Sequence, residues 1–222
     1  MATGTQQSDA SRFIDRIDGK AFPCVGAKSA VAKDGIEFFD AGDLRGGDTD
    51  ERLLRSLQAF AVDAGDDALF VSFVALFPQT PKLGEAEFER ALWQRLQALH
   101  ELDARDYDWD ASVSDQPASP RFSMSLGGRA FYVIGLHPGS NRKARRFHCA
   151  ALVFNRHSQF ETLREDGRYD KLREYIIERD TTFSGSRNPM LAMHGEASEA
   201  RQYSGRQVGA EWHCPFSAAH AK

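Results

Sequence analysis

The sequence predicts an α+β fold, in which helices flank a mostly antiparallel sheet and a long irregular C-terminal segment wraps around the functional site. Apolar residues recur at helical spacing on both sides of one continuous apolar run, residues 68–77. The dipeptide Gly127-Gly128 joins two short β-forming runs, as in an antiparallel hairpin. From residue 180 onward the periodicity disappears while aromatic residues persist, which favours a segment that packs without regular structure.

Each predicted element has a local reason. Leu53, Leu57 and Phe60 recur on one face of a helix that begins near Asp50 and stops at Gly65. The run 68–77 is rich in β-forming residues, so it reads as a buried strand that Pro78 ends. The same reasoning predicts further helices over 84–102, 159–164 and 169–179, and further strands over 121–125, 129–136 and 148–154.

Length and composition predict one domain over residues 1–222, frayed at 1–20 and at 217–222. With 41% hydrophobic residues the chain can bury a core, yet its longest apolar run is too short to cross a bilayer. A net charge of −4 argues against a nucleic-acid partner. The three cysteines are widely spaced without a CxxC pair, which argues against a disulfide framework and a structural zinc site and favours the cytoplasm.

Two motifs are candidates for chemistry. Residues 142–146 hold four basic side chains in a loop after a predicted strand, where a phosphate or carboxylate would find guanidinium partners. A solvated basic turn is the alternative. Cys214-Pro215 places a thiol on a stiff backbone, as in axial thiolate ligands of heme iron, and a buried structural cysteine is the alternative.

An ordered series of motifs resembles the YqcI/YcgG family. It comprises Phe-Pro-Cys at 22–24, Glu-Arg-Ala-Leu-Trp at 89–93, Gly-Leu-His-Pro at 135–138, Arg-Lys-Ala-Arg-Arg-Phe at 142–147, Leu-Val-Phe-Asn at 152–155, His-Ser-Gln-Phe-Glu at 157–161 and Trp-His-Cys-Pro-Phe at 212–216. The series covers nearly the whole chain. The resemblance implies heme b and oxygen chemistry, since the family includes heme-dependent N-hydroxylases of guanidine and amine nitrogens.

Residues for each part of a heme site can be named on this basis. Cys214 is the first choice as axial ligand, followed by His137 and His157, with Cys24 remaining an option. A hydrogen-bonded packing role is the alternative for any lone histidine of this chain, including these two. The predicted propionate anchors are Arg142, Arg145 and Arg146.

The expected function is N-hydroxylation of a small amine or guanidine by a heme monooxygenase that uses O2 and an electron-donor reductase. Candidates for the substrate and proton-delivery shell lie in the non-periodic segment: Asn188, Glu196, Glu199, Tyr203 and Arg206. Loop-stabilising hydrogen bonds are the alternative role for each. A heme-binding or redox-sensing protein without turnover, and a hydrolase or transferase of phosphorylated ligands, are the other classes considered. A homodimer is compatible with the sequence.

Overall fold

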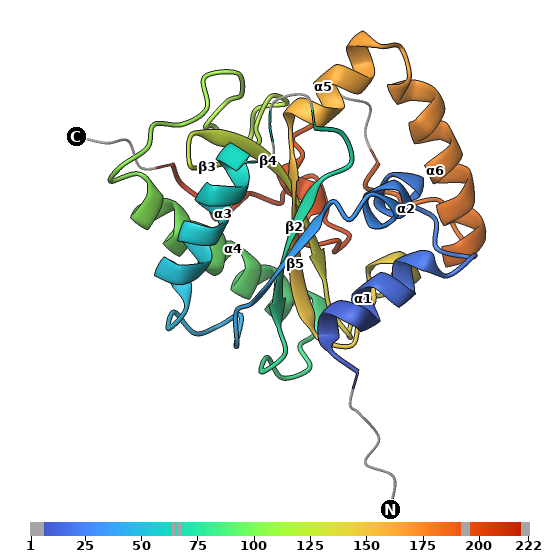
Figure 1. Ribbon diagram of the computed structural model, residues 1–222, viewed down its shortest axis with the longest axis horizontal. Coiled ribbons are helices and arrows are strands. Elements are labelled where there is room, and N and C mark those ends of the chain that lie inside the picture. The colour runs from blue at the N-terminus through green and yellow to red at the C-terminus, as the bar shows by residue number, and fades with distance from the viewer. Residues whose placement is uncertain (1–6, 64, 66–67, 192–195, 219–222) are drawn as a thin grey trace, which may run out of the picture.

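The computed structural model describes residues 7–63, 65, 68–191 and 196–218. One five-stranded sheet lies between two groups of helices (Figure 1). The strands are β1 (Ile36–Asp40), β2 (Ser72–Phe77), β3 (Met124–Leu126), β4 (Arg129–Leu136) and β5 (Ala150–Arg156), in the order β1-β2-β5-β4-β3. β1 pairs with β2 in parallel and the other three pairings are antiparallel, so the predicted α+β class with a mostly antiparallel sheet is confirmed.

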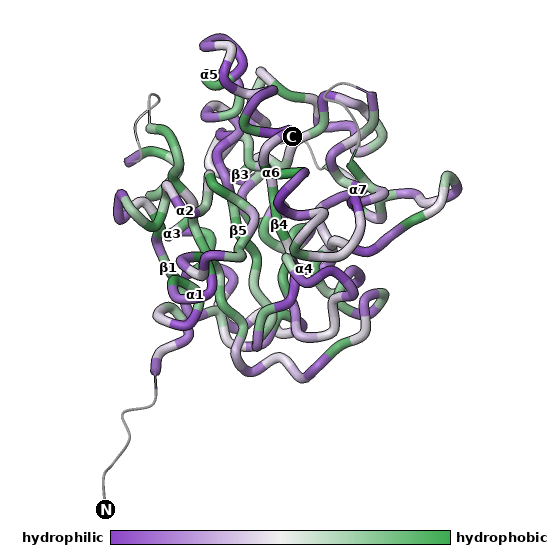
Figure 2. The backbone as a smooth tube through the Cα atoms, turned by 90° about the vertical axis from the view of Figure 1, so that its right-hand side faces the viewer, coloured by the Kyte–Doolittle hydropathy of each residue, from purple (hydrophilic) through white to green (hydrophobic). Residues whose placement is uncertain are grey.

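The central strands are buried on both faces because their side chains alternate between two cores. Phe73 and Phe77 of β2 face a cluster that contains apolar residues of α3 (Asp50–Asp63) and α4 (Glu85–Asp103). Val74 and Leu76 face a second cluster with α1 (Asp9–Asp18), next to α2 (Val25–Ala32). Two-sided burial explains why β2 reads as an unbroken apolar run, and the strands form a hydrophobic band through the molecule (Figure 2).

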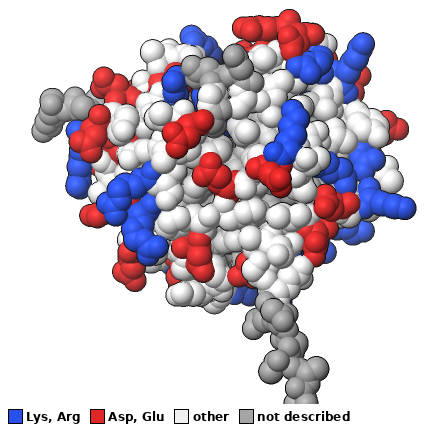
Figure 3. All heavy atoms as spheres, in the orientation of Figure 1, with Lys and Arg blue, Asp and Glu red and all other residues white. Residues whose placement is uncertain are grey.

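The chain after β5 forms α5 (Ser158–Glu165), α6 (Tyr169–Ser184) and the single turn α7 (Ala200–Tyr203). α6 lies on the same side of the sheet as α1 and α2 (Figure 1). Arg179 ties α6 to the segment before α2 by donating to the carbonyls of Lys20, Phe22 and Pro23. Charged side chains of both signs are interspersed on the face shown in Figure 3.

The elements with strong local signals agree with the prediction. α4 spans almost the predicted residues, and Gly127 and Gly128 adopt φ values of +62° and +67° in the hairpin turn. The strand predicted from residue 68 instead begins at Ser72, because Phe70 adopts a left-handed φ of +62°. The predicted strand 121–125 is shorter and shifted, and the helix predicted over 169–179 continues to Ser184.

The prediction of a frayed segment over residues 1–20 was wrong for residues 9–18, which form α1. Ser8 caps this helix, and Phe13 and Ile17 bury themselves against the sheet, with 4% and 3% of their surface exposed. α2 and β1 were also missed, since both are short and partly exposed. At the other end, residue 217 is tied to α4, because Ser217 N–H donates to the side chain of Gln97, and residues 219–222 lie outside the described residues.

Gly135 should not tolerate a side chain. A Cβ there would lie 2.7 Å from Phe88 and 2.9 Å from Leu92, both fully buried in α4. We expect Gly135→Ala to lower the free energy of unfolding by about 1–3 kcal/mol through overpacking. Gly26→Ala is the control, because its Cβ would meet Phe70 at an ordinary 3.6 Å within a helix. Urea unfolding measures both, and equal stability of the two variants would contradict this account of the α4–sheet contact.

Candidate functional site

Four polar side chains from distant parts of the chain meet at the end of the sheet where β3 begins and β5 ends. Ser123 immediately precedes β3, His157 follows β5, Glu161 lies one turn further on α5, and Glu199 precedes α7. We call these residues the Glu199 cluster. The tertiary structure alone brings them together, since 76 positions separate Ser123 from Glu199.

The Glu199 cluster is a continuous chain of polar contacts. Ser123 Oγ lies 3.4 Å from Glu199 Oε2 and 3.2 Å from His157 Nδ1, and His157 Nε2 lies 2.9 Å from Glu161 Oε1. A serine hydroxyl carries a single proton, so Ser123 can donate to only one of its neighbours at a time. The proton positions on Glu199, Ser123 and His157 are therefore coupled.

Glu199 is the group in this cluster whose protonation the environment changes most clearly. Burial raises the pKa of its carboxyl from 4.5 to about 7, although Arg164 and the Ser123 hydroxyl favour the ionised form. The nearby Glu161 raises it further. Glu199 therefore exchanges a proton close to neutral pH, as expected of an acid–base group in a site.

The serine–histidine–glutamate order resembles a hydrolase triad, but the serine does not fit that role. Ser123 has no exposed surface, and its Oγ also lies 3.2 Å from the carbonyl of Phe131. A nucleophile must reach a substrate carbon, which this hydroxyl cannot do from its enclosed position. The cluster is better suited to proton transfer than to covalent catalysis.

α7 has only four residues and depends on tertiary contacts for its position. The Tyr203 hydroxyl donates to the carbonyl of Phe131 and accepts from the N–H of Met124, both at 3.1 Å. Its ring stacks on Trp93 with the centroids 5.5 Å apart. Tyr203 thus joins α7 to β3, β4 and α4, and is a positioning residue for the preceding Glu199.

Two predicted arginines also position α7. Arg145 donates to the carbonyls of Gln202, Tyr203 and Gly135, and so links α7 to β4. Arg206 pairs with the buried carboxylate of Glu89, which also accepts a hydrogen bond from Ser204. Neither guanidinium fork faces an open site.

The remaining predicted shell residues are not in the cluster. Glu196 is exposed, and Asn188 Oδ1 accepts the N–H of Met190 within a turn. Sequence reasoning missed Ser123, which has no local signal, and Glu161. The spacing of Glu161, four residues after His157 in a helix, was the signal for that contact.

Cys214, His157 and His137, which were predicted as iron ligands, do not line a common cavity that could hold a heme. Cys214 packs against the aromatic core, where burial raises the pKa of its thiol to about 12. Both ring nitrogens of His157 contact other members of the Glu199 cluster, Nδ1 the hydroxyl of Ser123 and Nε2 the carboxylate of Glu161. His137 has a buried Nδ1 without a hydrogen-bond partner, but only 1% of the residue is exposed and its ring stacks on Phe88 with centroids 4.2 Å apart.

The three predicted propionate anchors are also engaged within the chain. Arg142 pairs with Asp180 and donates to the carbonyl of Ser186. Arg145 is committed to main-chain carbonyls as described above. Arg146 donates to the carbonyls of Ser140 and Asn141. These guanidinium groups are thus occupied by partners within the chain, and their contacts do not support the prediction that they hold heme propionates.

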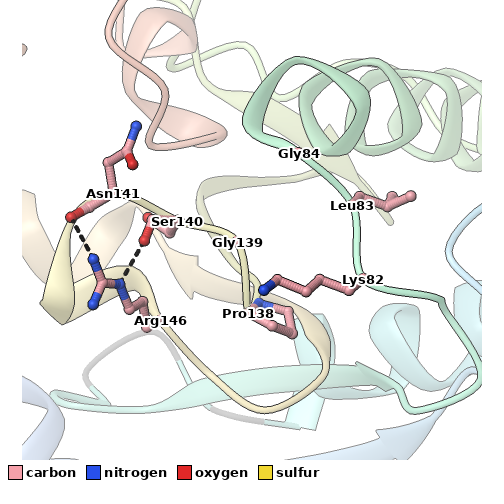
Figure 4. Close-up of a pocket in the computed structure, with 8 residues that line it drawn as sticks. All are labelled: Lys82, Leu83, Gly84, Pro138, Gly139, Ser140, Asn141 and Arg146. Atoms are coloured by element: carbon pink, nitrogen blue, oxygen red, sulfur yellow. Dashed lines mark hydrogen bonds between the residues drawn. The ribbon is translucent and has the colours of Figure 1, made fainter.

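A surface depression of about 520 Å³ lies between the loop that precedes α4 and the loop that follows β4 (Figure 4). Its walls are Lys82, Leu83, Gly84, Pro138, Gly139, Ser140, Asn141 and Arg146. The lining is mostly polar side chains and main chain, whereas a heme requires an apolar slot and an accessible donor. The residues proposed for heme therefore do not fit that group in this arrangement.

The fold and the cluster define an α+β protein with a partly buried carboxylate–serine–histidine–carboxylate site at one end of its sheet. Residues 13–217 match the model of the YqcI/YcgG family, and the chain belongs to this family. Comparisons with curated proteins and with solved structures gave no match. Among the described helices, none combines the length and apolar character needed to cross a membrane.

Tyr203→Phe should destabilise the fold although the ring is kept. Removal of the hydroxyl leaves the N–H of Met124 and the carbonyl of Phe131 without this partner in the core. We expect a loss of about 2–4 kcal/mol in the free energy of unfolding, measured with urea. Tyr175→Phe, on the exposed side of α6, is the matched control and should be neutral. A Tyr203→Phe protein as stable as this control would show that α7 is held mainly by other contacts.

The raised pKa of Glu199 predicts a pH-dependent stability difference between the wild type and Glu199→Gln. A carboxyl with a folded pKa of about 7 binds more protons than the unfolded chain between pH 4.5 and 7. Wild-type stability relative to the variant should thus fall by up to about 3 kcal/mol as the pH rises through this range, and then stay constant. Urea unfolding across pH 4–8 measures the difference, and a constant difference would mean that Glu199 keeps an ordinary pKa.

Proposed function

We propose that the protein binds a small amine or guanidine at the Glu199 cluster and hydroxylates its nitrogen. O2 and an electron-donor reductase would be the co-reactants, and heme b the cofactor that the family resemblance implies. The observation that carries the substrate class is the partly buried carboxylate of Glu199 with a pKa of about 7. Burying a cation is costly unless an anion pairs with it, and Glu199 supplies such an anion.

The cluster supports binding followed by proton removal. Ionised Glu199 would accept a hydrogen bond from the charged nitrogen and orient it. A protonated amine has no free lone pair, so it must lose a proton before oxygen can be added. Glu199 would take that proton and pass it through Ser123 and His157 to Glu161, whose side chain is 46% exposed. This path connects a partly buried site to solvent.

No step is assigned to the heme, since the residues predicted for it do not fit. The N-oxygenation itself therefore rests on the family resemblance, whereas cation binding rests on the Glu199 cluster. The proposal also includes the irregular C-terminal segment as a wall of the site, because Glu199 and Tyr203 both come from this segment and Phe216 reaches the same core as Tyr203.

A redox sensor based on Cys214 is less well supported. The thiolate is the reactive form of cysteine, and burial raises the pKa of the Cys214 thiol to about 12. The thiol therefore stays protonated and slow to oxidise at neutral pH. This observation argues against sensing at this residue.

Ligand titration tests the binding step. Butylguanidine and butylamine should bind the wild type, whereas the neutral isostere butylurea should not. Glu199→Gln should weaken butylguanidine binding about tenfold or more, since it removes a charged hydrogen-bond acceptor. Wild-type affinity should also rise as the pH increases through 7, because Glu199 becomes ionised. Calorimetry at constant ionic strength measures all of these affinities.

The control for this titration is Glu174→Gln, which removes an exposed carboxylate of α6. It should bind butylguanidine as the wild type does. Equal affinity for butylurea and butylguanidine, or an unchanged affinity in Glu199→Gln, would rule out the cluster as a cation site.

The cofactor is tested separately by reconstitution with hemin. A Soret band and an N-hydroxy product detected by mass spectrometry would support N-hydroxylation, and Cys214→Ala and His137→Ala would then identify the ligand. Cation binding without a Soret band would retain the Glu199 site and reject the heme reaction.

A further inference from the structure

Three potential metal ligands meet far from the Glu199 cluster. Their donor atoms, from Asp9, His148 and Cys149, all lie within 4.8 Å of one another. His148 Nε2 is 2.6 Å from Asp9 Oδ1. Asp9 is the first residue of α1, and the other two immediately precede β5.

The local backbone explains how adjacent residues contribute to one site. Neighbouring side chains in a regular strand point to opposite faces. The chain bends at residues 148 and 149 before β5 begins, so His148 and Cys149 can turn toward the same point. α1 brings Asp9 to this point because Phe13 packs edge-on against Phe147, with ring centroids 5.4 Å apart.

The donor set selects the kind of metal. One sulfur, one imidazole nitrogen and one carboxylate oxygen suit zinc, whereas calcium and magnesium prefer oxygen donors alone. The side chains of His148 and Asp9 are each 33% exposed, which leaves a route for the ion and a position for water. Cys149 lies beneath them with 4% of its surface exposed.

The surrounding charges are mixed. Asp9 and Asp40 act on the Cys149 thiol as negative charges, and Arg12 acts as a positive one. Zinc would bring two positive charges to a thiol flanked by two carboxylates. The hydrogen bond between His148 and Asp9 would be replaced by two bonds to the metal.

We propose that Asp9, His148 and Cys149 bind a zinc ion with water as the fourth ligand, and that the ion fastens α1 to the start of β5. This zinc site is separate from the Glu199 cluster, because His157 of that cluster follows the opposite end of this seven-residue strand. That length corresponds to about 20 Å. The inference is therefore independent of the proposed function.

Cobalt(II) substitution tests the site with a spectroscopic readout. The metal-free full-length protein should bind one Co²⁺ per chain with a thiolate-to-metal charge-transfer band, and added Zn²⁺ should remove the band. Cys149→Ala should abolish the band. Cys214→Ala, which removes another partly buried thiol, is the control and should keep it.

His148 and Asp9 are partly exposed, so substituting either of these ligands leaves the core packing unchanged. His148→Gln and Asp9→Asn should each weaken Co²⁺ binding about tenfold or more. Saturating Zn²⁺ should raise the Tm of the wild type by about 5 °C or more, and this shift should disappear in His148→Gln. A charge-transfer band that survives in Cys149→Ala, or wild-type affinity in both surface variants, would overturn the proposal.

Discussion

Burial of β2 and β5 on both faces is the constraint on which the rest of the structure depends. Because these strands pair with each other at the centre of the sheet, each face needs its own layer of helices. α3 and α4 cover one face, and α1 with α2 covers the other. The N-terminal helix is consequently part of the core: without Phe13 and Ile17, the apolar side chains of Val74 and Leu76 would lose their cover.

The candidate site follows from the same arrangement, since a cluster of titratable side chains lies at each end of β5. His157 follows the last residue of β5 and reaches Ser123 and Glu199, while His148 and Cys149 precede the first residue and reach Asp9. A strand fixed by two-sided packing holds both sets of side chains firmly. The polar groups themselves sit on loops and helix ends, where contact with solvent is available.

The Glu199 side of this arrangement depends on a segment with little structure of its own. α7 is a single turn, and its place is set by the Tyr203 hydroxyl, by Arg145 and by the Arg206–Glu89 pair. Tyr203, Arg145 and Arg206, which were predicted to bind a cofactor or substrate or to take part in catalysis, thus stabilise the position of α7 beside Glu199. Arginine suits this work because its planar guanidinium can donate to several carbonyls at once.

The sequence by itself determined the α+β class, the α4 helix and the glycine hairpin, because each depends on local periodicity or on backbone freedom at positive φ. Its motif series also identified the family, and two members of the Glu199 cluster, His157 and Glu199, were among its candidates. Only the tertiary structure decided that α1 is buried, that the three arginines serve the chain itself, and that Ser123 and Cys149 meet their distant partners. The physical reason is that such contacts depend on three-dimensional packing between segments far apart in sequence, which leaves no periodic signal in either segment.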